Sequence, residues 1–169
     1  MHERPEDLAT LQAVLDESYA NATAHLLSVH EPARRLDATA VASALTGMRL
    51  LVLATTTRDG RPITGPVDGV FFRGWFHFGS APDSLRFHHL RARPEVSATH
   101  LPGEHLAVTV HGTAEVIDVS APEHAEFRQT VLDIYLPRYG DEWLTILEEG
   151  AFARIRPRRM FTFSMPDPH

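Results

Sequence analysis

The sequence predicts a mainly β protein with helical additions, built around a six-stranded antiparallel barrel. Six segments after residue 47 have the apolar, β-branched and aromatic composition of strands. Tight turn signals join the first three of these segments, and connections so short allow only antiparallel pairing. Gly112 interrupts the longest segment. A glycine inside a strand is typical of a bulge or a close backbone approach, which suits the bend of a barrel.

The length of the chain predicts a single domain over residues 1–169. A chain of this size can bury one continuous core without splitting. We divide the domain into an N-terminal helical cover (1–46), a barrel core (47–119), a helical insert (120–150) and a closing strand (151–165).

The N-terminal cover consists of two predicted helices. Residues 5–29 form the first, because apolar side chains recur at steps of three and four and Pro5 suits a first helical turn. Pro32 breaks this helix, and Asp37 caps a second, short helix that ends at Gly47. The polar face of the first helix is acidic and mixed, which favours packing on the barrel over a membrane or partner surface.

The barrel core begins with three strands joined by short turns. Residues 50–57 form the first strand, and the Asp-Gly pair at 59–60 is a strong signal for a tight hairpin turn. Residues 62–72 form the return strand. The Arg-Gly pair at 73–74 then turns the chain into a third strand over residues 75–79.

The rest of the chain alternates helices and strands. The predicted elements are a helix over 84–91 that Pro94 closes, strands over 95–100 and 106–117, helices over 121–139 and 141–149, and a strand over 152–164. Pro157 interrupts the last strand. This strand therefore lies at an edge of the sheet or carries a bulge.

Composition and charge exclude several function classes. The chain has no cysteine, which rules out disulfides, thiolate metal sites and cysteine nucleophiles. The formal net charge of −6 disfavours a general nucleic-acid binder. No apolar run is long enough to span a bilayer and no signal-peptide pattern opens the chain. We therefore expect a cytoplasmic protein with no nucleic-acid or membrane partner.

The segment between the third strand and the following helix is the best candidate for binding a ligand. Gly79 and Ser80 end the strand, and Ser84 and Leu85 begin the helix. A helix N-terminus offers unpaired N–H groups and a partial positive charge, both of which suit a phosphate. Arg86 could hold that phosphate through two N–H donors. Judged on spacing alone, an ordinary capped loop is the competing interpretation.

The order of these features resembles the pyridoxamine 5′-phosphate oxidase-like split β-barrels. The matching text is LLVLATTTRDGRPITGPVDGVFFRGWFHFGSAPDSLRFHHLRARPEVSATH, followed by LAVTVHGTAEVID and the closing strand RIRPRRMFTFS. The resemblance covers residues 37–118 well and 152–164 loosely. It implies a split barrel of the FMN-binding type.

In that family FMN lies at the dimer interface, so the resemblance implies a homodimer with the cofactor between its subunits. The residues that it places around the phosphate are Ser80, Ser84 and Arg86, with Gly79 and Leu85 next to them in the cofactor site. The residues that it places beside the isoalloxazine ring are Val67, Asp68, Gly69 and Val70. Many relatives carry an apolar or neutral residue where Asp68 stands.

The eleven histidines contain no His-Glu-x-x-His pattern, and we predict no metal site. Surface or hydrogen-bonded positions are the favoured interpretation for most of them. By family analogy, His105 and His111 could instead reach the cofactor from the partner subunit. Haem ligation is a further alternative, because some family members handle haem.

The resemblance implies an FMN-dependent oxidoreductase acting on a small molecule, with no catalytic acid or base that we can assign. A reductase that uses the deazaflavin coenzyme is one alternative, because Arg154, Arg156 and Arg158 could hold its anionic tail. These arginines could also simply protect a solvated strand edge. A non-enzymatic flavin or haem binder is the other alternative. We expect an obligate homodimer, because residues 105–117 are predicted to form a long exposed edge.

Overall fold

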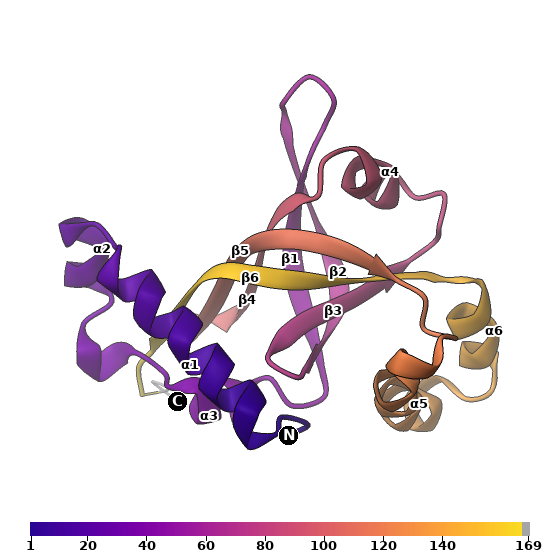
Figure 1. Cartoon of the computed structure of the whole chain (residues 1–169), viewed down its shortest axis with the longest axis horizontal. Helices are drawn as coiled ribbons and strands as arrows, with labels where there is room; N and C mark the ends of the chain where they lie inside the picture. The colour runs from indigo at the N-terminus through magenta and orange to yellow at the C-terminus, as the bar shows by residue number, and fades with distance from the viewer. Residues whose placement is uncertain (167–169) are drawn as a thin grey trace.

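The computed structural model describes residues 1–166 and contains a closed antiparallel barrel of six strands (Figure 1). The strands are β1 (Met48–Thr56), β2 (Pro62–Phe72), β3 (Trp75–Ser80), β4 (Glu95–Gly103), β5 (Leu106–Ile117) and β6 (Ala151–Ser164). The helices are α1 (Pro5–Ala20), α2 (Ala24–Val29), α3 (Ala38–Ala44), α4 (Leu85–Ala92), α5 (Ala125–Tyr139) and α6 (Glu142–Glu149), with short 3-10 turns η1 (Pro32–Arg34) and η2 (Pro122–His124). The predicted fold class is confirmed.

The barrel closes in the strand order β1, β2, β3, β6, β5, β4, and β4 pairs back onto β1. The prediction that residues 105–117 form an exposed edge was wrong, because β6 pairs with β5 from Leu106 to Ile117. The basic run of β6 therefore does not lie at a sheet edge either. This pairing could not be seen in the sequence, because the helical insert separates the two strands along the chain.

A bulge interrupts the pairing of β5 with β6. His111 pairs with Arg159 and Gly112 pairs with Pro157, so Arg158 has no direct partner. A Cβ at Gly112 would collide with the backbone carbonyl of Arg156, which explains why glycine is needed there. The close backbone approach expected at Gly112 and the bulge expected near Pro157 are both confirmed.

Two apolar clusters lie on opposite sides of the barrel wall. The first fills the interior with side chains from all six strands, and Leu11, Val41 and Phe87 add to it from α1, α3 and α4. The second lies outside the wall, where α5 and α6 pack on β2 and β6 around Phe127 and Phe152. In Figure 1 the N-terminal helices and the helical insert accordingly lie at opposite ends of the molecule.

The first predicted helix is divided in two. Asn21 ends α1, and its side-chain amide donates to the backbone oxygen of Glu17. The Thr23 hydroxyl then accepts a hydrogen bond from the N–H of Leu26 and starts α2. Asn and Thr favour such local bonds at helix ends, so the polar pair interrupts a helix that the apolar spacing alone predicts as continuous.

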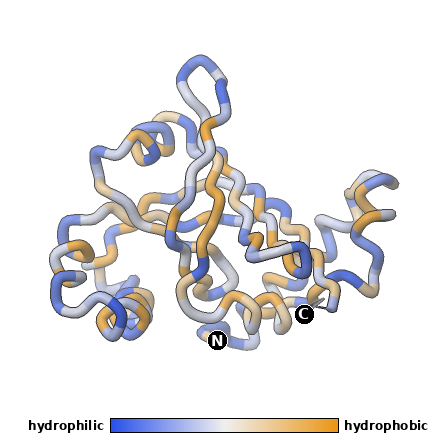
Figure 2. The backbone as a smooth tube through the Cα atoms, turned by 180° about the vertical axis from the view of Figure 1, so that it is seen from behind, coloured by the Kyte–Doolittle hydropathy of each residue, from blue (hydrophilic) through white to orange (hydrophobic). Residues whose placement is uncertain are grey.

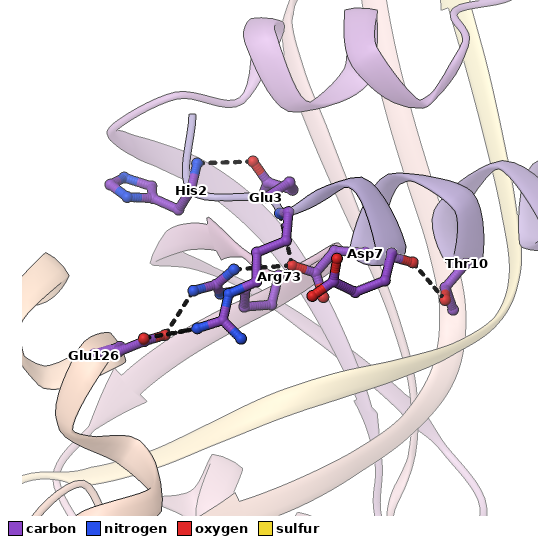
Figure 3. A network of polar contacts seen from close by, with 8 residues as sticks. His2, Glu3, Asp7, Thr10, Arg73 and Glu126 are labelled. Carbon is purple, nitrogen blue, oxygen red and sulfur yellow. Dashed lines mark hydrogen bonds and ion pairs between the residues drawn. The ribbon is translucent and has the colours of Figure 1, made fainter.

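A charged network fixes the insert to the barrel and to the N-terminus (Figure 3). Arg73, in the β2–β3 turn, contacts Asp7 of α1 at 3.1 Å and Glu126 of α5 at 2.6 Å. Arg4 also contacts Glu126, at 2.7 Å. The neighbouring arginines lower the pKa of the Glu126 carboxyl. One carboxylate at the first turn of α5 is thus held by two different elements of the chain.

Among residues 1–166, no helix combines the length and the apolar composition that crossing a membrane requires.

Candidate functional site

A cavity of about 760 Å³ lies outside the barrel wall, between β2 and β3 on one side and α5 and α6 on the other. Much of its lining is aromatic and comes from Phe127, Tyr135, Tyr139, Trp143 and Phe152. The rings of Tyr135 and Trp143 stack with centroids 4.4 Å apart and an interplanar angle of 9°. A cavity of this size with aromatic walls suits a small organic molecule.

The charged side chains that line this cavity are all acidic: Asp68, Asp83, Glu142 and Glu149. None of them forms an ion pair with another residue in the range 1–166. Because no Arg or Lys lines the cavity, these four carboxylates repel an anion that enters it. The interior of the cavity is therefore unsuited to a phosphate group.

Two buried polar side chains complete the lining. His77 is 5% exposed, and its Nδ1–H donates to the carbonyl oxygen of Trp75 at 3.1 Å. Burial lowers the pKa of His77 to about 3, so the ring is neutral at neutral pH. Tyr135 is also 5% exposed, and burial together with the charge of Asp68 raises the pKa of its hydroxyl. This hydroxyl therefore stays protonated and can donate a hydrogen bond.

Ser84, Leu85 and Arg86 of the predicted cofactor-binding set lie at the start of α4. The Ser84 hydroxyl accepts a hydrogen bond from the N–H of Phe87 at 3.4 Å and caps the helix. The Arg86 guanidinium donates to the carbonyl oxygen of Pro66 on β2 at 2.9 Å, and burial lowers its pKa. Its other N–H groups have no hydrogen-bond acceptor within the described residues. Arg86 thus bridges α4 and β2 with donors left for a ligand.

The structure divides the predicted phosphate-binding set into two groups. Ser84, Leu85 and Arg86 follow one another at the first turn of α4. Gly79 and Ser80 lie at the end of β3 and line the aromatic cavity instead. The loop between the two groups therefore joins the cavity to the start of α4.

The predicted ring-contacting residues alternate across the barrel wall. The Val67 side chain is buried in the interior cluster, and Gly69 faces Leu51 there. Asp68 and Val70 point outward and line the cavity. Because side chains alternate along a strand, a cofactor outside the barrel meets the side chains of Asp68 and Val70 but only the backbone of the other two.

A second outer surface, which we call the open face, extends over β2, β1, β4 and β5. Pro66, Val52, Thr99 and Thr109 lie side by side across these strands, next to Leu50. Leu50 and Val52 are 61% and 52% exposed. Figure 2 shows an orange run of hydrophobic residues along one strand of the long hairpin. Exposed apolar strips of this kind are typical of interaction surfaces.

The two histidines predicted to reach a cofactor lie far apart on β5 and its preceding turn. His111 borders the open face, where its Nδ1 lies 2.7 Å from the Ser97 hydroxyl. Burial, and then Arg159, lower the pKa of His111. His105 lies six residues earlier, a separation of about 20 Å along a strand. Their approach to a partner's cofactor stays a prediction. Within residues 1–166, no three His, Asp or Glu side chains are placed to hold a metal ion.

Comparison with known families agrees with this architecture. The model of the pyridoxamine 5′-phosphate oxidase family matches residues 38–162, which is most of the chain. The chain belongs to this family. The match begins at the first residue of α3 and ends at residue 162, so it includes the whole barrel except the last two residues of β6.

Solved structures share the fold of this family member at low sequence identity. A conserved hypothetical protein from Mycobacterium tuberculosis has a TM-score of 0.68 and 23% identity, covering 83% of this chain and 94% of its own. An FAD-binding protein from Mesorhizobium loti has a TM-score of 0.58 and 24% identity, covering 76% and 95%. An F420 reductase has a TM-score of 0.52 and 18% identity, covering 70% and 93%. No curated protein sequence matches the chain.

The basic residues of β6 have partners within this oxidase-family barrel. The Nε atoms of Arg154 and Arg156 lie 2.9 Å and 3.5 Å from the Glu115 carboxylate. Both guanidinium groups also lie over the Trp75 ring, at 4.5 Å and 6.0 Å from its centroid. The bulge takes Arg158 out of this alternation. Two of the three arginines predicted to form a basic stripe therefore already share one carboxylate and one aromatic ring.

Sequence analysis gave the helical insert no part in the site, yet the insert forms one wall of the cavity. Tyr135, Tyr139 and Trp143 recur at intervals of four, which places aromatic rings on one face of consecutive helices. This spacing is the signal that could have indicated the wall. His77 was also missed, because nothing in its neighbours in sequence marks a strand histidine as buried.

Proposed function

We propose that this member of the pyridoxamine 5′-phosphate oxidase family is an FMN-binding oxidoreductase. The observation that carries the proposal is the position of Arg86. Its guanidinium lies between the start of α4 and β2, with one bond to Pro66 and its other donors available. A helix N-terminus beside a partly buried arginine combines the two features that bind a phosphate in proteins. The printed name of the FAD-binding relative supports a flavin in general terms.

Different residues near Arg86 would contact the phosphate and the ring of FMN. Its single phosphate would be held by Arg86 and the backbone N–H groups of Ser84 and Leu85 at the helix start. Its ring would lie against the outward side of β2 near Asp68 and Val70. When bound, FMN supplies the hydride or electron transfer, while the protein orients it and limits its contact with water. We assign no catalytic acid or base.

We further propose that the functional unit is a homodimer joined through the open face. Leu50, Val52 and Leu101 are each more than half exposed on this surface. Apolar side chains gathered on a sheet are costly in water, and a second copy of the same face would cover them. An exposed edge of β5 does not form this interface, because β5 is paired on both sides.

A deazaflavin coenzyme is the second candidate, because an F420 reductase shares the fold. Its longer anionic tail would need basic partners beyond Arg86. Arg154 and Arg156 already pair with Glu115, so they are less available for such a tail. The structure thus favours FMN of the two. Haem has less support, because His77, the histidine that lines the cavity, is only 5% exposed and stacks on Phe127.

The ligand that copurifies with the protein tests the proposal. Its visible spectrum and its mass distinguish FMN, deazaflavin and haem, and reconstitution of the apoprotein with each compound ranks their affinities. We expect FMN to bind most tightly, and we expect oxidation of a reduced nicotinamide to depend on bound FMN. Tight FMN binding without any turnover would instead make the protein a flavin binder, and binding of haem alone would contradict the proposal.

A further inference from the structure

We propose that a second cavity, on the N-terminal side of the barrel, binds a small organic acid through its carboxylate. This cavity, which we call the N-terminal cavity, lies between α1, the β2–β3 turn, β6 and the start of α5, and its volume is about 640 Å³. One wall comes from α1 and from Arg4 just before it, whereas the family match begins only at residue 38. The site is therefore separate from the proposed flavin site and depends on the N-terminal helix of this chain.

The lining of the N-terminal cavity suits the organic part of such a ligand. Its apolar side chains come from α1, β2, α5 and β6, and they are Leu11, Val14, Phe72, Phe127 and Pro157. Cavities of this size that combine apolar walls with a few polar groups are typical sites for small molecules. The apolar walls would contact the body of the ligand, and the polar groups would bind its charged end.

Arg154 is the residue that would bind the carboxylate. It lines the cavity, its Nε–H donates to Glu115 at 2.9 Å, and its guanidinium lies 4.5 Å from the centroid of the Trp75 ring. These two contacts fix the guanidinium, while its two terminal nitrogens have no hydrogen-bond acceptor within residues 1–166. A planar guanidinium with free N–H donors matches the two oxygens of a carboxylate. Arg154 thus provides an oriented donor group at the cavity wall.

Most of the acidic side chains in this lining are already paired with arginines. Asp7 accepts hydrogen bonds from Arg73 and from the backbone N–H of Arg4, and Glu126 accepts from both of these arginines (Figure 3). A paired carboxylate repels an incoming anion less than a free one, because the charge of its partner offsets its own. Glu123, which is exposed, is the one acidic residue of the lining without an ion pair among the described residues.

The wall that the two cavities share supports a positive potential on the N-terminal side. His77 and Phe127 line both cavities, so their stacked rings separate the two. Burial is the main cause of the low pKa of His77, and the charges of Arg154 and His124, which line the N-terminal cavity, lower this pKa further. The same two groups would attract a carboxylate. The aromatic cavity, by contrast, has no Arg or Lys in its lining.

Calorimetric titration with two matched probes tests the inference at pH 7.5. Phenylacetate carries a carboxylate at this pH, and phenylacetamide has nearly the same shape without the charge. We expect phenylacetate to bind at least about ten-fold more tightly than phenylacetamide, because only the acid can form charge-assisted hydrogen bonds with Arg154. Equal affinity of the two probes, or no binding of phenylacetate at millimolar concentration, would overturn the inference.

Two neighbouring arginines give a matched pair of variants. Arg154→Gln should weaken phenylacetate binding by about ten-fold or more, because it removes the guanidinium that lines the cavity. Arg156 also pairs with Glu115 and lies over Trp75, but it does not line the cavity. Arg156→Gln should therefore change the affinity by less than about two-fold. Unchanged phenylacetate affinity in a folded Arg154→Gln protein would overturn the site.

Charges placed on α1 test whether the N-terminal helix forms a wall of the site. Thr10 is exposed and lines the cavity, so Thr10→Glu adds a negative charge there without removing a buried group, and it should weaken phenylacetate binding. Ala13→Glu, at an exposed position of the same helix outside the lining, should leave the affinity unchanged. Glu123→Gln should strengthen binding, because it removes the unpaired carboxylate. Equal effects of Thr10→Glu and Ala13→Glu would contradict a site beside α1.

Tryptophan fluorescence shows which cavity the probe occupies. The chain has two tryptophans, of which Trp75 lines the N-terminal cavity and Trp143 the aromatic one. Phenylacetate should change the emission of Trp75 in the Trp143→Phe variant, and it should leave the emission of Trp143 unchanged in the Trp75→Phe variant. A response of Trp143 without one of Trp75 would place the ligand in the aromatic cavity and overturn the inference.

Titration of the FMN-loaded protein separates this inference from the proposed function. Bound FMN should change the affinity for phenylacetate by less than about two-fold, because the His77–Phe127 pair lies between the two sites. Displacement of phenylacetate by FMN would overturn the inference. If phenylacetate binds as expected while FMN does not bind, the N-terminal cavity stands and the proposed function fails.

Discussion

The two outer surfaces of the barrel differ in what covers them. On one side, α5 and α6 pack on β2, β3 and β6 and enclose an acidic aromatic cavity. On the other side, the open face leaves Leu50 and Val52 in water. One strand, β2, contributes to both surfaces. The covered surface is built from segments distant in sequence, whereas the open face is built from two hairpins, β1–β2 and β4–β5, whose turns are visible in the sequence.

The largest expected effect concerns the covered surface. Phe127 is 2% exposed and stacks on His77, with ring centroids 4.2 Å apart. Phe127→Ala should lower the free energy of unfolding by about 3–5 kcal/mol, because it removes a buried aromatic side chain and leaves a void. Urea denaturation measures this, with Leu144→Ala on the exposed side of α6 as the control. A loss below about 1 kcal/mol would mean that the insert does not pack as a core.

A charge on the open face should instead affect assembly. Val52→Lys should weaken the proposed dimer by about 3 kcal/mol, because a lysine without a partner would be buried between the subunits. Light scattering over a dilution series gives the dissociation constant. Val116→Lys is the control, since Val116 is 50% exposed and lies outside the open face. If Val52→Lys dimerises as well as the unmodified protein, the open face is not the interface.

The sequence predicts the open face better than the covered surface, and the reason is physical. The strands and turns of the open face follow from local signals, such as the Asp-Gly pair at 59–60 and the alternation of residues along β1. The partner of β5 depends on β6, which follows only after the insert, and so the expected edge was wrong. The cavity requires the packing of α5 and α6 on β2, a long-range contact; the spacing of the aromatic residues indicates one wall but not the strand that faces it.

The pH dependence of stability tests the burial of His77 on the covered surface. The pKa of His77, about 3 in the folded protein, lies below its ordinary value of 6.5, so the unfolded chain takes up this proton first as pH falls. Stability should therefore decrease below about pH 6.5, by about 1.4 kcal/mol per pH unit, and by about 2–3 kcal/mol at pH 4.5. His77→Gln should flatten the dependence measured by urea denaturation at each pH. His88→Gln, on the exposed side of α4, is the control. An unchanged pH profile in His77→Gln would contradict the burial of a neutral imidazole.

The smallest expected effect concerns the basic residues of β6. Replacing Arg154 and Arg156 together by Ala should change FMN affinity by less than about 0.5 kcal/mol, because both side chains already pair with Glu115. Titration of FMN and of the deazaflavin coenzyme into both proteins measures the difference. Tighter binding of the deazaflavin to the unmodified protein, lost in the double variant, would make the second candidate correct.

Titration of FMN into Arg86→Ala tests whether Arg86 binds the FMN phosphate. We expect a loss of about 1.5–3 kcal/mol in binding free energy, because the variant removes charge-assisted hydrogen bonds to the phosphate. Arg91→Ala is the matched control, since Arg91 lies on the same helix and likewise donates to a backbone carbonyl, that of Pro82 at 2.8 Å. We expect Arg91→Ala to bind FMN as tightly as the unmodified protein. A folded Arg86→Ala protein with unchanged FMN affinity would contradict the binding of the FMN phosphate by Arg86.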